Sequence, residues 1–307
     1  MPAASTLLLA ALAMVFFAAN SILGRAALHG AGLFPLGPSA IDPISFTAVR
    51  LCTGALATWA VVRASRGGAR AAADTGSWGS ALALFVYAAC FSWAYRALPA
   101  GLGVLVLFPA VQATMLLGGL RRGERPGWAQ GGGLVLALGG LALLVRPGPA
   151  APPWAASASM FAAGVAWGFY SLRGMGSPDP GAATAGNFLR AAPMALGLCL
   201  VAGLAGGPAA PARLRLDVAG LGYAAASGAL ASGLGYMLFY RAIQGLRAAA
   251  AAGIQLSVPV LAALGGVALL GEAFTLRMVL ASAAILGGIS LVLAGRVPRT
   301  GLERRTG

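Results

Sequence analysis

Two arginines lie deep inside apolar stretches of the chain, where a charged side chain is unfavourable. Arg50 and Arg190 each fall about eight residues into a run of hydrophobic residues. If these runs cross a bilayer, a buried arginine costs about 2.5–3.5 kcal/mol even on the insertion scale that is most tolerant of charge. A water-filled cavity, a group of backbone carbonyls or an anionic ligand group would compensate for it. Each arginine is therefore a candidate either for substrate contact or for a scaffold role at a helix end.

Other polar and aromatic side chains also lie in the middle of apolar runs. Trp167 and Tyr170 are three residues apart and would share one helix face. Aromatic rings combined with amides suit a pocket for a small amphipathic metabolite, whereas each residue alone could equally serve helix packing. With the two arginines, the predicted substrate-cavity residues are Asn20, Arg50, Trp93, Gln112, Trp167, Tyr170, Asn187, Arg190, Tyr236 and Gln255.

Prolines interrupt several of the same runs. Pro109 and Pro259 fall within the predicted fourth and ninth spans. A proline removes one helical hydrogen bond and bends the helix, which suits a gating element. It also occurs in packed membrane helices that do not move. We predict Pro109 and Pro259 as candidate hinges.

Residues for catalysis, metal binding or nucleotide binding are sparse. The chain has one histidine and seven dispersed acidic residues, whereas intramembrane enzymes cluster such groups. It has no lysine and therefore no phosphate-binding loop of the GxxxxGK[ST] type. We predict no catalytic residue, no metal, no cofactor and no ATP-binding motif. Glu124 and Glu272 each follow an apolar run, which favours a helix cap or an ion pair with a loop arginine.

The composition indicates a membrane protein. Hydrophobic residues make up 59% of the chain and charged residues 9%, against about 25% charged in soluble domains. The apolar residues recur in stretches of about twenty, the length that crosses a bilayer as a helix. The net charge of +14 comes from scattered arginines without a basic stripe, so nucleic acid is not a predicted partner. The predicted spans are 5–23, 42–62, 77–97, 100–120, 127–146, 153–173, 182–204, 217–238, 248–270 and 275–295.

The arginines predict the orientation of these ten spans. With the N-terminus inside, thirteen arginines fall on the cytoplasmic side and six on the outer side, as the positive-inside rule requires. An even number of spans returns the C-terminus to the cytoplasm.

The two halves of the chain repeat one another. Short matches occur in the same order at an offset of 140 to 150 residues: Phe46 to Arg50 with Gly186 to Arg190, Tyr95 to Leu98 with Tyr240 to Ile243, Pro109 with Pro259, and Gly123-Glu124 with Gly271-Glu272. Because each copy contains five spans, the second copy is inverted relative to the first. Inverted repeats are a recurring architecture of secondary transporters.

These repeated residues resemble the drug/metabolite transporter superfamily, and within it the EamA group, whose two repeats each have five helices. The resemblance covers roughly 5–295. It implies an all-α integral membrane fold, a first repeat over 1–150, a second over 151–298 and a cytoplasmic tail over 299–307. The first copy departs from the pattern around its fourth helix, where its spacing from Pro109 to Glu124 exceeds that from Pro259 to Glu272.

A secondary transporter of small metabolites is the function that we predict. It would export amino acids or related metabolites by alternating access around a cavity at the middle of the bilayer. An intramembrane lipid-modifying enzyme and a channel-like facilitator are the alternatives. The expected partners are a small-molecule substrate and the lipid bilayer, the expected state is a monomer, and the expected location is the bacterial inner membrane with both termini in the cytoplasm.

Overall fold

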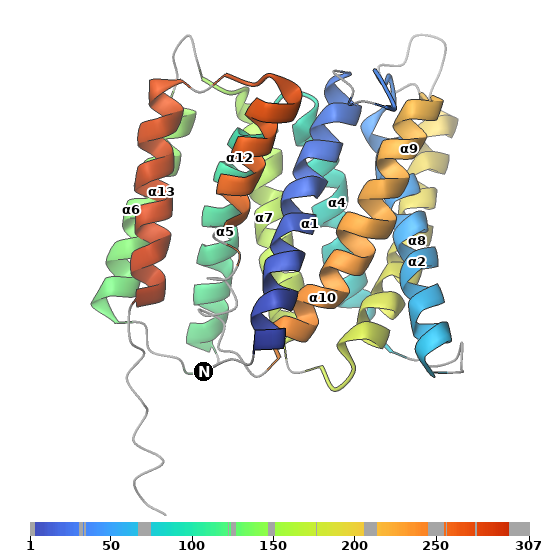
Figure 1. Ribbon diagram of the computed structural model, residues 1–307, viewed down its shortest axis with the longest axis horizontal. Helices are drawn as coiled ribbons and strands as arrows, with labels where there is room; N and C mark the ends of the chain where they lie inside the picture. Colours follow the sequence, from blue (N-terminus) through green and yellow to red (C-terminus); the bar gives the residue numbers. More distant parts are fainter. Residues whose placement is uncertain are drawn as a thin grey trace, which may run out of the picture.

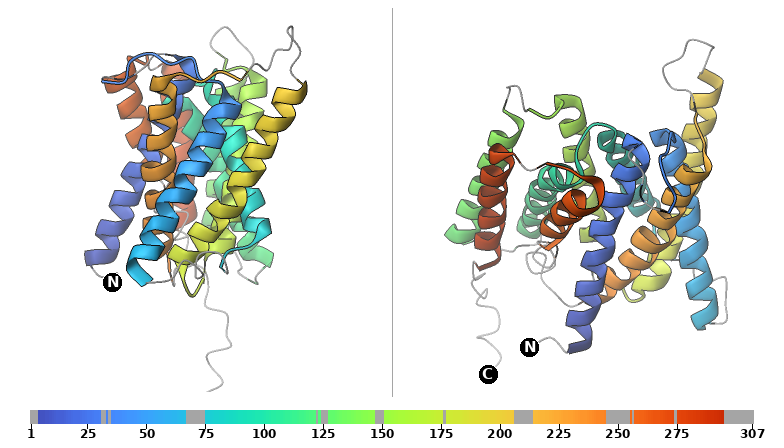
Figure 2. Two further views of the ribbon diagram at one scale, coloured as in Figure 1. Left: turned by 90° about the vertical axis from the view of Figure 1, so that its right-hand side faces the viewer. Right: turned by 45° about the horizontal axis from the view of Figure 1, so that its top comes forward.

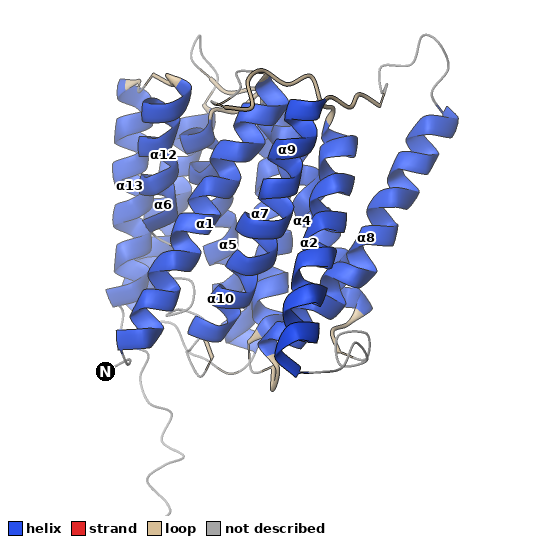
Figure 3. Cartoon of the chain, turned by 45° about the vertical axis from the view of Figure 1, so that its right-hand side comes forward, coloured by secondary structure: helices blue, strands red, loops and turns tan. Residues whose placement is uncertain are grey.

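Ten helical rods stand side by side and give the protein the form of a membrane-spanning bundle (Figure 1). The computed structural model describes residues 4–30, 33, 35–66, 75–121, 123, 127–146, 151–175, 177–205, 214–244, 255, 257–273 and 275–294. No strand occurs among these residues, and loops connect the helices only at the two ends of the bundle (Figure 3). Five helices of the described part are long and apolar enough to cross a membrane, and three shorter ones are apolar.

The rods follow the chain in order, and the eighth is built from three consecutive segments. Their bounds are α1 Ala4–His29, α2 Pro43–Arg66, α4 Trp78–Tyr95, α5 Ala100–Arg121, α6 Trp128–Val145, α7 Trp154–Gly174, α8 Pro180–Ala205, α9 Val218–Ala226 with η1 Ser227–Leu234 and α10 Gly235–Ala242, α12 Ser257–Leu270, and α13 Leu276–Ala294.

The largest difference between a predicted boundary and a described helix end concerns the first span. The first span was predicted to end at residue 23, because Arg25 looks like a loop residue, but α1 continues to His29. The Arg25 side chain is satisfied within the bundle by Glu272 and by backbone carbonyls, so its charge does not end the helix. Gly30, with φ of 78°, follows the last residue of α1. In the predicted ninth span, the described helix begins at Ser257, and residues 248–254 lie outside the described part.

The repeated Gly-Glu pairs have a common structural cause. Gly123 and Gly271 both have positive φ, 84° and 65°, a conformation that favours glycine because it has no Cβ. Each follows the fourth helix of its repeat. The glycine therefore turns the chain at the helix end, which explains why the pair recurs in both copies.

Equivalent helices of the two copies pack against each other. The second helices, α2 and α8, are in contact on one side of the bundle, and the fifth helices, α6 and α13, are in contact on the other (Figures 1 and 2). The first helix begins and the last helix ends at the same face of the bundle, here called the N-terminal face (Figure 1). The odd number of helices per copy thus produces two inverted repeats.

The rim of the bundle carries exposed tryptophans. Trp78, Trp128 and Trp154 each begin a helix, and they are 63%, 99% and 81% exposed. Tryptophan prefers the boundary between lipid and water, because its ring is amphipathic. These side chains mark the levels at which the bundle meets the two membrane surfaces.

The eighth rod contains a π-helical segment that was not predicted. Segment η1 interrupts the rod between α9 and α10 over eight residues. Such segments are rare and frequently lie at functional sites. Gly228 within η1 packs directly on α2, since a Cβ there would lie 2.2 Å from the carbonyl oxygen of Arg50. The irregular segment and the buried arginine are therefore in direct contact.

Candidate functional site

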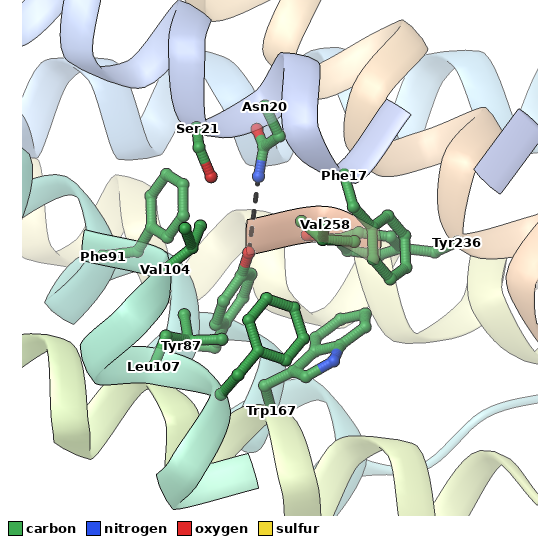
Figure 4. A pocket seen from close by; sticks show the side chains of 11 residues that line it. Phe17, Asn20, Ser21, Tyr87, Phe91, Val104, Leu107, Trp167, Tyr236 and Val258 are labelled. Carbon is green, nitrogen blue, oxygen red and sulfur yellow. Dashed lines mark hydrogen bonds between the residues drawn. The ribbon is translucent and has the colours of Figure 1, made fainter. Parts of the chain in front are cut away.

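A small cavity lies in the interior of the bundle. Its volume is about 20 Å³, room for about one water molecule. Polar and aromatic side chains converge on it from several helices (Figure 4). Its lining comprises Phe17, Asn20, Ser21, Tyr87, Phe91, Val104, Leu107, Phe108, Trp167, Tyr236 and Val258.

The cavity is lined by the same three helices of each repeat. The first copy contributes its first, third and fourth helices, α1, α4 and α5, and the second copy contributes α7, α10 and α12. These are the first, third and fourth rods of the second copy, since α10 belongs to its third rod. The cavity therefore lies where the two inverted repeats meet.

Aromatic rings form the part of the wall on the side of the N-terminal face. Trp167 lies at the centre of this group, with its ring 5.3 Å from Phe17, 5.1 Å from Tyr87 and 4.6 Å from Tyr236. The Trp167 Nε1–H donates a 2.8 Å hydrogen bond to Gln255 Oε1. This bond links α7 to the residue just before α12 and fixes the plane of the indole.

Arg50 lies directly behind this wall and is 1% exposed. Its Nε donates to Ser232 Oγ at 2.9 Å, and its Nη2 donates to Tyr236 Oη at 2.8 Å. Its guanidinium carbon is 5.2 Å from the ring centre of Tyr87 and 4.8 Å from that of Phe91. Desolvated contacts of this kind are worth about 2 kcal/mol, so they offset part of the burial penalty. Nη1 has no hydrogen-bond partner among the described residues.

A chain of hydrogen bonds connects the π-helical segment to the cavity. Ser227 Oγ donates to Asn20 Oδ1 at 2.6 Å, and Asn20 Nδ2 donates to Tyr87 Oη at 3.4 Å (Figure 4). Ser232, also in η1, holds Arg50. Both serines of η1 therefore position side chains of the cavity, and a shift of this segment would move Asn20 and Arg50 together.

The face opposite the N-terminal face is closed by an ion pair. Arg25 Nε lies 3.3 Å from Glu272 Oε1, and the Arg25 Nη1 donates to the carbonyls of Tyr95 and Arg96. The Glu272 carboxylate also accepts from the backbone N–H of Ala100 at 2.8 and 2.9 Å. This arrangement ties α1, the start of α5 and the end of α12 together above the cavity. The interpretation of Glu272 as a helix cap or ion-pair partner agrees with these contacts, whereas Glu124 lies outside the described residues.

Comparison with known proteins identifies the family. The model of the EamA-like transporter family matches residues 4–146 and again 154–294, once in each half of the chain. The chain belongs to the EamA-like transporter family. It is a multi-pass membrane transporter.

Two further proteins are similar to this EamA-like transporter. An uncharacterized protein of Pseudomonas aeruginosa is 52% identical over 303 residues, which cover 99% of each chain. A crystal structure of another protein is similar over 95% of this chain and 99% of its own, with a TM-score of 0.66 and 20% sequence identity. The latter match shows a common fold.

Four predicted site residues lie in or against the cavity of the EamA-like transporter. Asn20, Trp167 and Tyr236 line it, and Arg50 contacts its wall. Two more lie next to it. Gln255 accepts the hydrogen bond of Trp167, and Tyr170 stacks at 5.5 Å on the other side of that ring.

The structure places the other four predicted residues elsewhere. Trp93 is 50% exposed and lies under the Arg96 guanidinium at 5.1 Å, so it faces outward. Arg190 donates to the carbonyls of Thr75 and Gly186 at 2.6 and 2.9 Å. Asn187 accepts from the backbone N–H of Ser77 at 2.9 Å. Gln112 is buried on α5 but does not line the cavity.

The two predicted hinge prolines occupy different settings. Pro109 lies inside α5 and is buried. Pro259 is the third residue of α12 as described, a position whose N–H has no partner within that helix. Of the two, only Pro109 removes a hydrogen bond from the described helical ladder.

Two residues of the cavity wall were not predicted. Tyr87 and Phe17 lie in strongly apolar runs and look like ordinary core residues. The repeat gives no signal for Tyr87, since the matching position eight residues before Tyr240 is Ser232, and only the structure shows that Tyr87 contacts Arg50.

Proposed function

We propose that this EamA-like transporter is a secondary transporter that exports small metabolites, amino acids or related compounds, across the bacterial inner membrane. It works as a monomer by alternating access, without ATP, and both termini lie in the cytoplasm. One observation carries the proposal. The cavity is lined by equivalent helices of two inverted repeats, so movement of one repeat against the other could close one side while it opens the other.

The two sides of the cavity differ in a way that supports alternating access. Toward one membrane face, the Arg25–Glu272 pair and the Ala100 N–H bind three elements together. Toward the N-terminal face lie the buried rings of Tyr170 and Tyr240, whose centres are 5.4 Å apart, and no ion pair occurs there among the described residues. The conformation is therefore more firmly closed on the side of Glu272.

Purified protein in proteoliposomes tests the proposal. Vesicles would be loaded with amino acids, nucleobases, amines or organic acids, and efflux would be measured with and without a pH gradient. Val104 lines the cavity from α5, and Val104→Phe would fill the small space. Leu117→Phe on the same helix is the matched control, since Leu117 is 58% exposed.

We expect at least one solute to move in the native protein and in Leu117→Phe, and to stop in Val104→Phe. Thermal unfolding of each variant shows whether it is folded. If no solute moves under any gradient, or if a folded Val104→Phe transports normally, the proposal is wrong.

A further inference from the structure

The charge of Arg50 has no balancing carboxylate in the part of the chain that the structure describes. Each described acidic side chain is occupied at a helix end. Asp42 accepts from the backbone N–H of Arg215, Asp179 from that of Ala182, Asp217 from that of Gly220, and Glu272 pairs with Arg25. We infer that the substrate supplies the missing negative charge, and that it is a small carboxylate with an apolar body and no cationic group. This inference rests on the proposed function.

The hydrogen-bond polarity of the cavity fits an anion. The Tyr236 hydroxyl accepts from Arg50, and the Tyr87 hydroxyl accepts from Asn20. A tyrosine hydroxyl that accepts in this way keeps its own O–H as a donor. Both donors lie in the cavity wall. A carboxylate, which only accepts hydrogen bonds, complements a wall whose tyrosine hydroxyls already accept hydrogen bonds and are backed by a guanidinium.

The Arg50 guanidinium is held in a fixed position from which its charge can act on a ligand in the cavity. It is held by Ser232 and Tyr236 on one edge and by the faces of Tyr87 and Phe91. These contacts immobilise the guanidinium but contribute no full negative charge. Its Nη1 remains without a partner among the described residues. In surroundings of low dielectric, a positive charge attracts a nearby anion strongly and repels a nearby cation equally.

The other lining residues present apolar and aromatic surface and include no carboxylate to pair with an ammonium group. Phe17, Leu107, Trp167 and Val258 supply apolar and aromatic surface. Two polar acceptors near the cavity already accept a hydrogen bond within the protein. Asn20 Oδ1 accepts from Ser227, and Gln255 Oε1 accepts from Trp167. An ammonium group would find no carboxylate in the cavity wall and would lie close to the positive charge of Arg50. A carboxylate without an amine is therefore a better match than an amino acid.

Three probes with the same phenyl group separate these possibilities. They are 3-phenylpropionate, an anion, phenylalanine, a zwitterion, and 2-phenylethylamine, a cation, supplemented by the straight-chain carboxylates from acetate to hexanoate. Binding is measured at pH 7.5 as a rise in the unfolding temperature of the detergent-purified protein. Transport is measured by counterflow in proteoliposomes, with protein-free vesicles to subtract passive permeation.

The variants are chosen to separate charge from folding. Arg50→Gln removes the charge, and Arg63→Gln removes an exposed charge from the same helix as a matched control. Tyr236→Phe keeps the charge of Arg50 but deletes the hydroxyl that accepts from its Nη2, so it tests the site even if Arg50→Gln does not fold.

We expect at least one carboxylate to bind and to be transported, and 3-phenylpropionate to be preferred over the other two phenyl probes. Arg50→Gln should lose this preference by about tenfold or more, because a charge-assisted hydrogen bond is lost. Tyr236→Phe should weaken carboxylate binding, and Arg63→Gln should leave it unchanged.

Two different failures can be told apart. Transport of phenylalanine or the amine in preference to every carboxylate, or full carboxylate binding by folded Arg50→Gln, overturns the anion inference but leaves the transporter function standing. Absence of movement of any solute under any gradient contradicts the proposed function itself, and the anion inference with it.

Discussion

At the scale of single residues, equivalent positions of the two repeats have taken different roles. Arg50 and Arg190 match in the repeat, but Arg50 stacks on two rings beside the cavity while Arg190 binds the backbone carbonyls of Thr75 and Gly186. Arg190 thus has the contacts expected of a scaffold residue, whereas Arg50 lies beside the cavity, where we propose that it acts on the substrate. The repeat in the sequence identifies both arginines, and their contacts in the structure distinguish them.

Asp217 permits a prediction on pH. It begins α9, where burial alone would raise the pKa of its carboxyl, but hydrogen bonds from the N–H groups of Gly220 and Ala40 and from Ser39 lower that pKa below its ordinary value. A lowered pKa in the folded state means that the carboxylate stabilises the fold above about pH 4. This contribution is lost as the pH falls through the folded pKa.

The measurement compares native protein with Asp217→Asn, which keeps a capping oxygen, and with Asp217→Ala. Asp217→Ala should lower stability at pH 7 by about 1 kcal/mol, the usual value of an N-cap. Asp217→Asn should be less stable than the native protein at pH 7 but should approach it at pH 3, as read from thermal unfolding in detergent. An unchanged gap between the two proteins at both pH values would contradict this.

At the scale of elements, the π-helical segment connects α1 and α2 to the cavity. Its two serines hold Asn20 and Arg50, and its Gly228 packs against the backbone of α2. A wider helical turn moves side chains out of the usual register of an α-helix. In this rod it brings Ser227, Ser232 and Tyr236 onto the side that carries the polar contacts.

Gly228→Ala is expected to disturb this packing. The added Cβ would lie 2.1 Å from Thr53 Oγ1 and 2.2 Å from the carbonyl oxygen of Arg50, so η1 and α2 must separate. We expect a loss of about 1–3 kcal/mol, as for overpacked interiors, together with reduced transport. Gly287→Ala in α13 is the control, since its Cβ meets nothing within 4 Å. Equal unfolding temperatures for the two variants would show that the contact is not tight.

The Arg25–Glu272 pair permits a second prediction at this scale. Glu272→Gln leaves Arg25, which is largely buried, without its partner. We expect a loss of about 1–3 kcal/mol in thermal unfolding, within the range for unsatisfied buried groups. Arg25→Gln with Glu272→Gln should lose less than the sum of the single changes, because both partners of the pair are then neutral.

Additive losses in this double-mutant cycle would exclude coupling between the two side chains. The exposed Arg96, which stacks on Trp93, provides the control. Arg96→Gln should change the free energy of unfolding by no more than about 0.5 kcal/mol, as is usual for surface sites.

At the scale of the whole molecule, the inverted repeat accounts for the packing and for the location of the cavity. The second and fifth helices of the two copies pair with each other at the two sides of the bundle. The first, third and fourth helices surround the interior and line the cavity. One set of helices thus pairs at the sides of the bundle while the other surrounds the cavity.

Cysteine labelling tests the proposed orientation. The native cysteines Cys52, Cys90 and Cys199 are replaced by alanine, and a single exposed position is changed on each face. His29→Cys lies at the end of α1 and Arg63→Cys near the end of α2. A membrane-impermeant maleimide should label His29→Cys in intact cells and Arg63→Cys only after permeabilisation. The reverse pattern would invert the topology.

The large features of the fold could be predicted because they follow from hydrophobicity and repetition. The ten spans, the two copies and the family agree with the structure and with the family model. Boundaries were less accurate where a charge is satisfied inside the bundle, as for Arg25 in α1. A charged residue in a sequence does not reveal whether its partner, here 247 residues away, lies beside it.

The candidate site could be predicted only in part, because the direction of a side chain depends on packing. Trp93 and Trp167 look alike in sequence, yet one faces outward and the other lies at the centre of the aromatic group. The π-helical segment has no signal in its small residues, Ser227 to Leu234. Its geometry is set by contacts with α1 and α2 rather than by local preference.

The missing counter-charge of Arg50 has a consequence for the energy source. An anion that leaves a cell with a negative interior moves down the electrical gradient, which is worth about 2.3 kcal/mol per charge at 100 mV. This free energy would support a concentration of the anion outside the cell roughly 50 times that inside, without any coupled ion. A carrier of monovalent carboxylates would therefore need no proton relay, and its rate should rise with membrane voltage in vesicles poised by a potassium gradient and valinomycin.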